Sequence, residues 1–406
     1  MPDTEPLERP AADPALWLHD PQVTFLNHGA FGSCPRAVLA HQHEWQLRLE
    51  RQPLQFLVRE LEGHLDAARA ALAQFVGAAP DDLVFVPNTT AGVNTVLRSL
   101  RFAPGDELLV TNQEYNASRN ALNFVAERTG AQVVVAHVPF PVARAEELSE
   151  PVLAAVSPRT RLVLLDHVTS TTGLVTPLER LLAALNARGI ETLVDGAHAP
   201  GMIPLNLSAL GATYYTGNCH KWLCAPKGAA LLHVRRDRQA HIRPLVISHG
   251  ANSRRTDRSR FQLEFGWTGT GDPSAWLSVP ETLRYVGSLL PGGWPAVMAR
   301  NHALTLAAHR LLCDALAVAP PCPEECLGSL AAVPLPDAPV AQGPRAPWFE
   351  YPLQDALRER HGIEVPVFSW PAAPHRLLRI APQLYNSLPQ YRRLAAALQD
   401  TLAAGL

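Results

Sequence analysis

Residues Thr213–Gly228 read Thr-Tyr-Tyr-Thr-Gly-Asn-Cys-His-Lys-Trp-Leu-Cys-Ala-Pro-Lys-Gly, and the rest of the chain can be placed around them. Lys221 and Lys227 are its only lysines, since the other 33 of the 35 basic residues are arginine (35 minus 2). Arginine keeps its charge, whereas a desolvated lysine can lose its proton and attack a carbonyl carbon to form a Schiff base. We therefore interpret Lys221 as an amine retained for chemistry. The alternative is chance together with a surface charge.

Length and composition are those of a globular protein with more than one domain. The chain has 406 residues, of which 47% are hydrophobic and 18% charged. A net charge of −2, without a basic tract, predicts no nucleic-acid partner. The polar, proline-rich residues 1–21 form an N-terminal arm without the pattern of a signal peptide. No stretch approaches the ~20 apolar residues of a membrane helix, so we expect a cytoplasmic protein with no membrane partner.

The cysteines predict neither disulfides nor a metal site. Cys322-Pro-Glu-Glu-Cys326 could be half of a zinc site, but no second half exists. Without an export signal, reduced thiols are expected. The six cysteines are Cys34, Cys219, Cys224, Cys313, Cys322 and Cys326.

Short apolar runs alternate with helical patterns from residue 82 to residue 234. This alternation predicts an α/β fold with a mainly parallel, seven-stranded sheet covered by helices on both faces. Helices over 37–51 and 54–76 precede it. The expected strands are 83–86, 107–111, 131–138, 161–166, 190–195, 213–216 and 229–234, and the expected helices between them are 88–100, 116–128, 145–156 and 177–188.

The pattern changes near residue 270 and predicts a smaller α+β unit. The proline-rich stretch 319–347 interrupts the rhythm and is expected to hold no regular element. We predict a large domain over 22–290 and a small C-terminal domain over 291–406. The elements expected after residue 270 are helices 273–290, 296–316, 353–361 and 389–402 and strands 363–368 and 377–380.

Ligands of open parallel sheets bind beyond the carboxyl ends of the strands, where several polar residues fall. Asn88-Thr-Thr-Ala-Gly92 opens a helix whose free N–H groups and hydroxyls suit a phosphate. The alternative is ordinary N-capping by Thr89 or Thr90. Asp195 ends a strand and can pair with a protonated ring nitrogen or simply cap a turn.

Three further strand ends carry aromatic or titratable groups. Tyr115 can lie flat against an aromatic cofactor or be an ordinary buried tyrosine. His198 can donate to a ring oxygen. Asp166-His167 ends a strand in the same way as Asp195, although His167 can be a structural histidine. No Gly-x-Gly-x-x-Gly or Gly-x-Ser-x-Gly motif is present, which disfavours a dinucleotide fold and a hydrolase elbow.

The chain resembles the class V aminotransferase family, fold type I pyridoxal-phosphate enzymes, over about residues 22–402. Within the family it is most similar to the isopenicillin N epimerase-like branch, on residues 215–222 and Gly362-Ile-Glu-Val-Pro366. The other stretches that carry the resemblance are Asn27-His-Gly-Ala-Phe-Gly32, Asn88-Thr-Thr-Ala-Gly92, Gln113-Glu-Tyr-Asn116, Asp195-Gly-Ala-His198, Thr268-Gly-Thr-Gly-Asp272 and Arg379-Ile-Ala-Pro-Gln-Leu-Tyr-Asn386.

The resemblance implies pyridoxal 5′-phosphate, bound to Lys221 as a Schiff base. Lys221 would also move the Cα proton, and Asp195 and His198 would complete the catalytic set at the ring nitrogen and the ring oxygen. Tyr115 would stack on the ring. The phosphate would be held by Thr90, Ala91, Asn218 and His220.

The resemblance also implies a partner and a substrate side. Thr270 would reach the phosphate of a neighbouring subunit, so a homodimer is expected. Gly29 and Ala30 would line the substrate side, and Arg379 would bind the α-carboxylate of an amino acid. Lys227 is expected to be a surface charge.

The predicted function is Cα deprotonation of an amino acid, leading to epimerisation. Cysteine desulfhydrase or other C–S β-lyase chemistry and transamination are alternatives, and a non-catalytic binding protein on this fold is another. Residues 363–379 contain no cysteine, which argues against a sulfur relay. Tyr115 could be the second acid that an epimerase needs. The four arginines of residues 248–260 could bind a distal acidic group, or the loop could be merely solvated.

Overall fold

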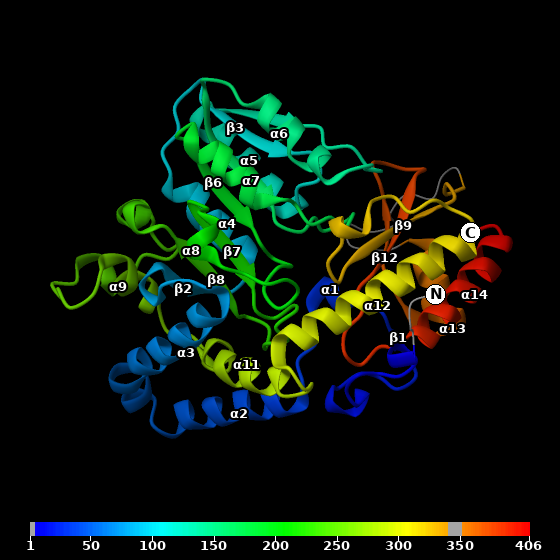
Figure 1. The fold of residues 1–406 in the computed structure, drawn as a ribbon. Coiled ribbons are helices and arrows are strands. Elements are labelled where there is room, and N and C mark those ends of the chain that lie inside the picture. Colours follow the sequence, from blue (N-terminus) through cyan, green and yellow to red (C-terminus); the bar gives the residue numbers. More distant parts are fainter. Residues whose placement is uncertain (1–4, 340–350) are drawn as a thin grey trace.

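A computed structural model describes residues 5–339 and 351–406, and it is organised around one seven-stranded sheet (Figure 1). Five neighbouring strands run parallel, and β8 pairs antiparallel with both β7 and β2, which confirms the predicted α/β architecture. In spatial order the strands are β2 (Leu83–Val86), β8 (Ala230–Val234), β7 (Tyr214–Asn218), β6 (Glu191–Asp195), β5 (Thr160–Asp166), β3 (Glu107–Thr111) and β4 (Gln132–Ala136).

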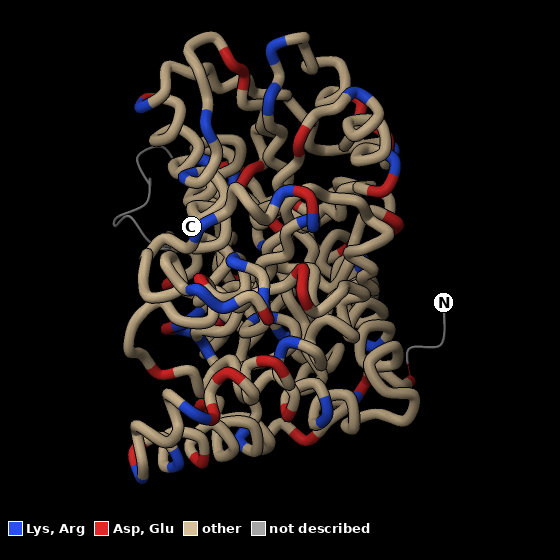
Figure 2. Tube along the Cα trace, turned by 90° about the vertical axis from the view of Figure 1, so that its left-hand side faces the viewer, with Lys and Arg blue, Asp and Glu red and all other residues tan. Residues whose placement is uncertain are grey.

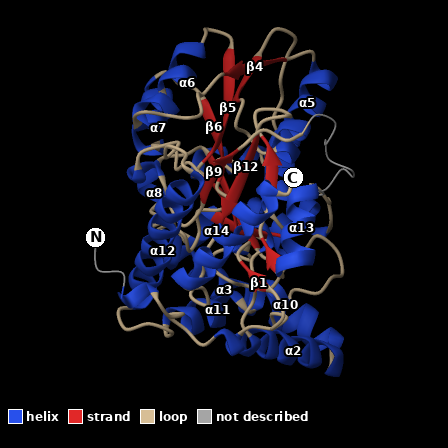
Figure 3. Cartoon of the chain, turned by 90° about the vertical axis from the view of Figure 1, so that its right-hand side faces the viewer, coloured by secondary structure: helices blue, strands red, loops and turns tan. Residues whose placement is uncertain are grey.

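Successive side chains of these strands enter two different cores, because alternate residues of a strand point to opposite faces. Leu109 and Val163 lie in one core, whereas Leu108 and Leu162 lie in the other. Helices therefore cover both faces, as Figure 3 shows for α5 on one side and α6 and α7 on the other. The first core packs on α3 (Leu61–Val76), α6 (Glu150–Ala155) and α7 (Leu178–Ala187), and the second on α4 (Thr89–Ser99), α5 (Asn116–Thr129) and α9 (Arg260–Gly266).

A second, smaller sheet lies in the C-terminal part, beside a core that also takes in residues from the N-terminal segment. Leu7 and Leu26 are buried in that core, and β1 (Thr24–Phe25) pairs in parallel with β10 (Ile363–Glu364). The long helix α12 (Gly293–Leu316) runs beside it (Figure 1). The remaining elements of this part are β9 (Ala331–Leu335), α13 (Pro352–His361), β11 (Val367–Ser369), β12 (Arg376–Ile380) and α14 (Leu388–Ala403).

Short helices connect the two parts and extend the large one at its N-terminal end. Within the predicted helix 54–76, the first turns form a π-helix at Gln55–Glu60 before α3 begins. The remaining helices are α1 (His28–Phe31), α2 (Arg36–Arg51), α10 (Ser274–Leu277), α11 (Val279–Gly287) and α8 (Leu207–Leu210), of which α8 lies between β6 and β7.

Three predictions from the pattern were wrong in detail. The proline-rich stretch 319–347 contains the strand β9, whose Pro334 is tolerated because β9 is an edge strand of the order β11-β12-β9. The expected strand 363–368 is divided at Pro366 into β10 and β11, which join different sheets. The expected helix 273–290 is likewise divided into α10 and α11. Residues 1–4 of the predicted arm and 340–347 of the proline-rich stretch lie outside the described residues.

Charges of both signs are interspersed along the chain, as Figure 2 shows. Three of the four arginines in residues 248–260 already pair with carboxylates of this chain. Arg255 binds Glu62, Arg258 binds Asp66 and Arg260 binds Glu264. Among the described residues, every helix is too short or too polar to cross a membrane.

Candidate active site

A cavity of about 170 Å³ lies at the edge of the sheet where β5, β6 and β7 end. This edge also receives the loops that follow β2 and β3, since all five strands point the same way. The predicted residues that line it are Ala30, Thr90, Tyr115, Asp195, His198, Asn218, His220 and Lys221. Residues separated by more than 100 positions are thus brought together as predicted.

The amine of Lys221 sits against His198, which is itself held by Trp222. The Trp222 indole donates to Nδ1 of His198 at 3.2 Å, and Nε2 of His198 lies 3.1 Å from the Lys221 Nζ. Because the indole can only donate, the neutral imidazole carries its proton on Nε2 and donates it to the amine. Burial, reinforced by the positive Arg379, lowers the pKa of Lys221 to about 7. The amine is therefore available as a nucleophile near neutral pH.

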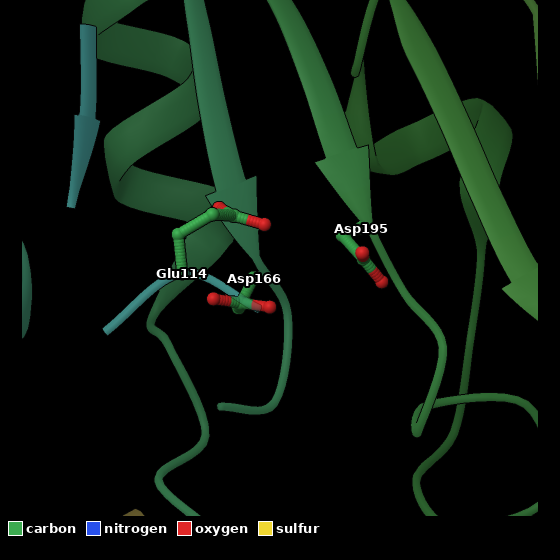
Figure 4. Close-up of side chains that lie close together, drawn as sticks. All are labelled: Glu114, Asp166 and Asp195. Carbon is green, nitrogen blue, oxygen red and sulfur yellow. The ribbon is translucent and has the colours of Figure 1, made fainter. Parts of the chain in front are cut away.

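Asp195 lines the cavity and lies close to two other carboxylates, those of Asp166 and Glu114 (Figure 4). Its oxygens accept hydrogen bonds from the Ser118 hydroxyl at 2.7 Å and the Ala197 amide at 3.0 Å, so the turn-capping role holds alongside its place in the cavity. Asp166 stands beside it in register on β5, and Glu114 completes a group whose oxygens lie within 4.8 Å of one another. Carboxylates are ligands that hard cations prefer, so the predicted absence of a metal stays a prediction.

The two added acids of this group have unsatisfied oxygens. Both oxygens of Glu114 and Oδ2 of Asp166 are buried and have no hydrogen-bond partner within the described part of the chain. Burial, and then the charges of Asp166 and Asp195, hold the pKa of Glu114 well above its usual range. Burial and Asp195 likewise raise the pKa of Asp166, with Lys221 opposing them. Burial and mutual repulsion therefore favour the protonated form of these acids.

Glu114→Gln is expected to stabilise the cofactor-free protein at pH 8 by about 1–3 kcal/mol. The pKa of Glu114 is higher in the folded protein than in the unfolded protein. The free energy of unfolding therefore falls as pH rises from the unfolded-state pKa to the folded-state pKa. The facing groups are Asp166, Asp195 and the cations Arg119 and Lys221. Thermal unfolding at pH 5 and pH 8 measures the effect, which should shrink at pH 5.

The control for this measurement is Glu127→Gln, at an exposed glutamate of the same helix region on α5. It should leave the pH dependence of unfolding unchanged. If the Glu114→Gln protein is no more stable than the wild type at pH 8, ionisation of Glu114 does not destabilise the folded protein.

The start of helix α4 supplies polar groups at the other end of the cavity. Asn88, rather than Thr89 or Thr90, caps the helix by accepting from the Ala91 amide at 2.8 Å. The amide of Ala91, the predicted phosphate donor, is thus engaged by Asn88, and its role toward a phosphate stays a prediction. Asn218 accepts from the Thr89 amide at 2.9 Å, whereas the buried Thr89 hydroxyl has no partner.

Two further features shape this end of the site. A Cβ on Gly92 would lie 2.1 Å from the Thr216 hydroxyl, so a glycine lets α4 approach β7 closely. His220 lies near the Ala229 carbonyl, with Nδ1 at 3.3 Å. Burial and Lys221 lower the pKa of His220 to about 4, so an anion is needed to protonate it.

Arg379 approaches the cavity from the smaller sheet. Its guanidinium donates to the backbone oxygen of Ser170, a cavity residue, and lies 4.9 Å from the ring of Phe368. The side chain is 2% exposed. Among residues 5–339 and 351–406, its Nε has no hydrogen-bond partner and its guanidinium makes no ion pair with a carboxylate. A buried guanidinium with spare donors suits a ligand carboxylate.

Four predicted residues are not among those that line this cavity: Gly29, Ala91, Thr270 and Arg379. Gly29 packs against Leu330, Ala381 and Trp222, where an added Cβ would meet Leu330 at 2.8 Å, and its place on the substrate side stays a prediction. Thr270 is exposed and lies outside the cavity of its own chain. His167 is a structural histidine, bonded to the Tyr215 hydroxyl at 2.9 Å.

Other lining residues had no role predicted from the sequence. Asn88 and Thr89 lay within the stretch expected to bind phosphate, and Asp166 was recognised as a strand end without a role. Phe31 and Ala197 lay within stretches that carry the family resemblance but were given no role, and Ser170 gave no signal because it sits in a loop with no periodic pattern. The residues added by the structure are Phe31, Asn88, Thr89, Asp166, Ser170 and Ala197.

The chemistry of these groups fits pyridoxal phosphate. A neutral amine is present for the aldehyde, and buried acids are present for the ring nitrogen. The orphaned hydroxyl of Thr89, together with Thr90 and His220, suits a phosphate. The unsatisfied donors of Arg379 suit a substrate carboxylate.

Comparison with known proteins agrees with this site. The family model described as Aminotransferase class-V matches residues 34–337. Isopenicillin N epimerase of Streptomyces clavuligerus is 35% identical over 393 residues, covering 94% of this chain and 95% of that protein. A probable chloroplastic L-cysteine desulfhydrase of Arabidopsis thaliana is 31% identical over 412 residues, covering 95% and 84%.

A solved structure shares the fold. The cystine C-S lyase C-DES, in complex with cysteine persulfide, has a TM-score of 0.76 at 23% identity and covers 93% of this chain and 97% of that one. The fold, the enzyme class and the cofactor predicted from the sequence are confirmed at the level of the family. The chain belongs to the class-V aminotransferase family of pyridoxal-phosphate-dependent enzymes.

Proposed function

We propose that this enzyme binds its cofactor through Lys221 and uses the same amine to move the Cα proton of an amino acid, with epimerisation as its reaction. The observation that carries the proposal is the position of the Lys221 amine, 3.1 Å from His198 in a cavity shared with Asp195. When bound, pyridoxal phosphate supplies an electron sink for the electron pair left by the broken Cα–H bond.

Each residue of the site has a separate proposed role. Arg379 binds the substrate carboxylate and so orients the Cα–H bond toward Lys221. Lys221, whose pKa is lowered to about 7 by burial, takes the proton as a general base. Asp195 holds a proton at the ring nitrogen. Thr90, Asn218 and His220 anchor the phosphate, and Thr89 adds a hydroxyl that the sequence did not assign.

Epimerisation requires an acid on the second face of the substrate, and Tyr115 is our candidate. Tyr115 lines the cavity, and burial and Asp195 raise the pKa of its phenol, so it keeps its proton at neutral pH. The 35% identity to isopenicillin N epimerases also favours this reaction.

C–S β-lyase activity is the second candidate, favoured by desulfhydrase relatives that span 95% of this chain. In that reaction the electron pair at Cα expels a thiol from Cβ, which needs no enzyme cysteine. All six cysteines are buried and unpaired, and burial raises the pKa of each thiol. A sulfur relay through one of them is therefore disfavoured.

Incubation with D- and L-amino acids in D₂O separates the two reactions. An epimerase gives racemised product with deuterium at Cα, read by NMR and chiral chromatography. Rapid release of sulfide and pyruvate from L-cysteine would instead establish the lyase. Accumulation of a keto acid with the amino group retained by the cofactor would indicate transamination, and no Cα exchange with any amino acid would reject the proposal.

The expected homodimer is also proposed, with Thr270 reaching the partner's phosphate. Leu245, Val246 and Ile247 are consecutive apolar residues, 46–56% exposed, and Leu54 and Val58 are 65% and 69% exposed. Exposed apolar surface of this extent is typical of an interface. Thr270→Val should weaken cofactor binding by about 3- to 10-fold, and sedimentation should show a dimer. A monomer that binds the cofactor normally would refute this arrangement.

A further inference from the structure

The segment Leu26–Gly32 joins the strand that carries Arg379 to the backbone of Lys221. On one side it extends the smaller sheet: the Ala381 amide donates to Leu26, and the His28 amide donates to Ala381, both at 3.2 Å. Ala381 lies two residues beyond Arg379. A shift of β12 is therefore transmitted directly to His28.

The His28 side chain continues this connection to Lys221. It is fully buried, with Nδ1 2.8 Å from the Tyr385 hydroxyl and Nε2 3.0 Å from the Lys221 carbonyl oxygen. Because a carbonyl only accepts, Nε2 carries the proton and Nδ1 accepts from Tyr385. Burial lowers the pKa of His28 to about 3, which keeps the imidazole neutral, and its hydrogen-bond partners then select the tautomer. The bonds thus run in one direction, from Tyr385 through His28 to Lys221.

The far end of the segment is fixed against the same region. Gly32 has φ of +67°, and a Cβ there would lie 1.9 Å from the His220 carbonyl oxygen, so this position requires glycine. Lys227 donates to the Gly32 carbonyl at 3.0 Å, which gives the second lysine a local role. Ala30 and Phe31, between the two anchors, line the cavity.

Tyr385 is in turn fixed within the C-terminal part. Its ring packs edge-on against Trp17 at 5.0 Å and against His19 at 4.5 Å. Gln383 accepts from Asn301 of α12 and approaches His28 Nε2 at 3.3 Å. Tyr385 and Gln383, a few residues along the chain from Arg379, are therefore held by side chains of the N-terminal segment and of α12.

We propose that His28 and Tyr385 are positioning residues that couple occupancy of the Arg379 carboxylate site to the placement of Lys221. The inference rests on the proposed roles of Arg379 and Lys221. A carboxylate that draws Arg379 and β12 inward shifts Ala381 and His28, and the bond to its carbonyl carries the shift to Lys221. The amine is thereby brought into position when an amino acid, rather than a simple amine, occupies the site.

The test measures how fast added pyridoxal phosphate forms its visible absorbance band with the cofactor-free protein, with and without saturating propionate. We expect propionate to change this rate in the wild type. Tyr385→Phe and His28→Asn should abolish most of that change and lower kcat by about 10- to 100-fold, with KM for the amino acid nearly constant. His28→Gln, which can still donate to Lys221 but is not set by Tyr385, should be intermediate.

Tyr391→Phe is the matched control, because Tyr391 is a fully buried tyrosine of the same region whose hydroxyl has no partner among residues 5–339 and 351–406. It should behave as the wild type does. The coupling is overturned if Tyr385→Phe matches Tyr391→Phe, retains the whole propionate effect, or raises KM at constant kcat. A wild type that forms no visible band, or a Lys221→Ala protein that forms it, refutes the proposed function itself, and the coupling falls with it.

Discussion

Lys221→Ala is expected to abolish the visible absorbance band of the bound cofactor and to reduce turnover by at least about 10²–10⁴-fold, the share that a positioned proton-transfer group contributes. The band depends on the bond between this amine and the cofactor aldehyde. The same amine is proposed to take the Cα proton. Absorbance titration with pyridoxal phosphate and Cα-deuterium exchange measure the two losses separately.

The chain provides an unusually clean control, since Lys227 is its only other lysine. Lys227→Ala should keep the band, because its amine is committed to the Gly32 carbonyl. Borohydride reduction followed by peptide mass spectrometry should place the cofactor adduct on Lys221 alone. An adduct on Lys227, or a band that persists in Lys221→Ala, would contradict the assignment.

Arg379→Gln is expected to lower kcat/KM for amino acids by about 30- to 4,000-fold. Loss of a buried, hydrogen-bonded charge pair costs roughly 2–5 kcal/mol. Converted at about 1.36 kcal/mol per factor of ten, this free energy gives the stated decrease in kcat/KM. The guanidinium makes no ion pair with a described carboxylate, so a ligand carboxylate is the partner it lacks. Amines without a carboxylate should react no more slowly with the variant, and comparison of an amino acid with its decarboxylated analogue measures this directly.

Arg376→Gln is the matched control on the same strand. Arg376 is also buried, but it donates to the backbone oxygens of Pro336 and Leu406. It lies three positions before Arg379, so the two side chains leave β12 on opposite faces. Its loss should lower stability and leave the preference for a carboxylate intact. Equal loss of that preference in both variants would remove Arg379 from its proposed role.

The architecture was predictable where local pattern and tertiary environment agree. The buried strands of the large sheet are short apolar runs between helical patterns, and these were recognised to within a few residues. Strand β9 was missed because Pro334 reads as a break, although an edge strand can accommodate a proline. The division at Pro366 was missed because β10 pairs with β1, which is far away in the sequence, whereas β11 pairs with the neighbouring strand β12.

The site was predictable to the extent that strand ends carry unusual polar residues. Lys221, Asp195 and His198 stand at such ends and do meet in one cavity. The pairing of Asp166 with Asp195 depends on strand order, which a single sequence does not reveal. The engagement of the Ala91 amide by Asn88 is a matter of a single side-chain rotamer. The connection from Tyr385 to Lys221 spans 164 positions (385 minus 221) and has no local signature.

The pairing of β1 with β10 has a consequence for synthesis on the ribosome. Thr24 and Phe25 emerge early, yet their partners Ile363 and Glu364 emerge only near the end of translation. The seven-stranded sheet can form in the interval, since its strands all lie between residues 83 and 234. Leu26, Trp17 and the other early apolar residues must wait uncovered until then, so a chaperone that shields the nascent N-terminus should raise the yield of native protein more than one acting after release.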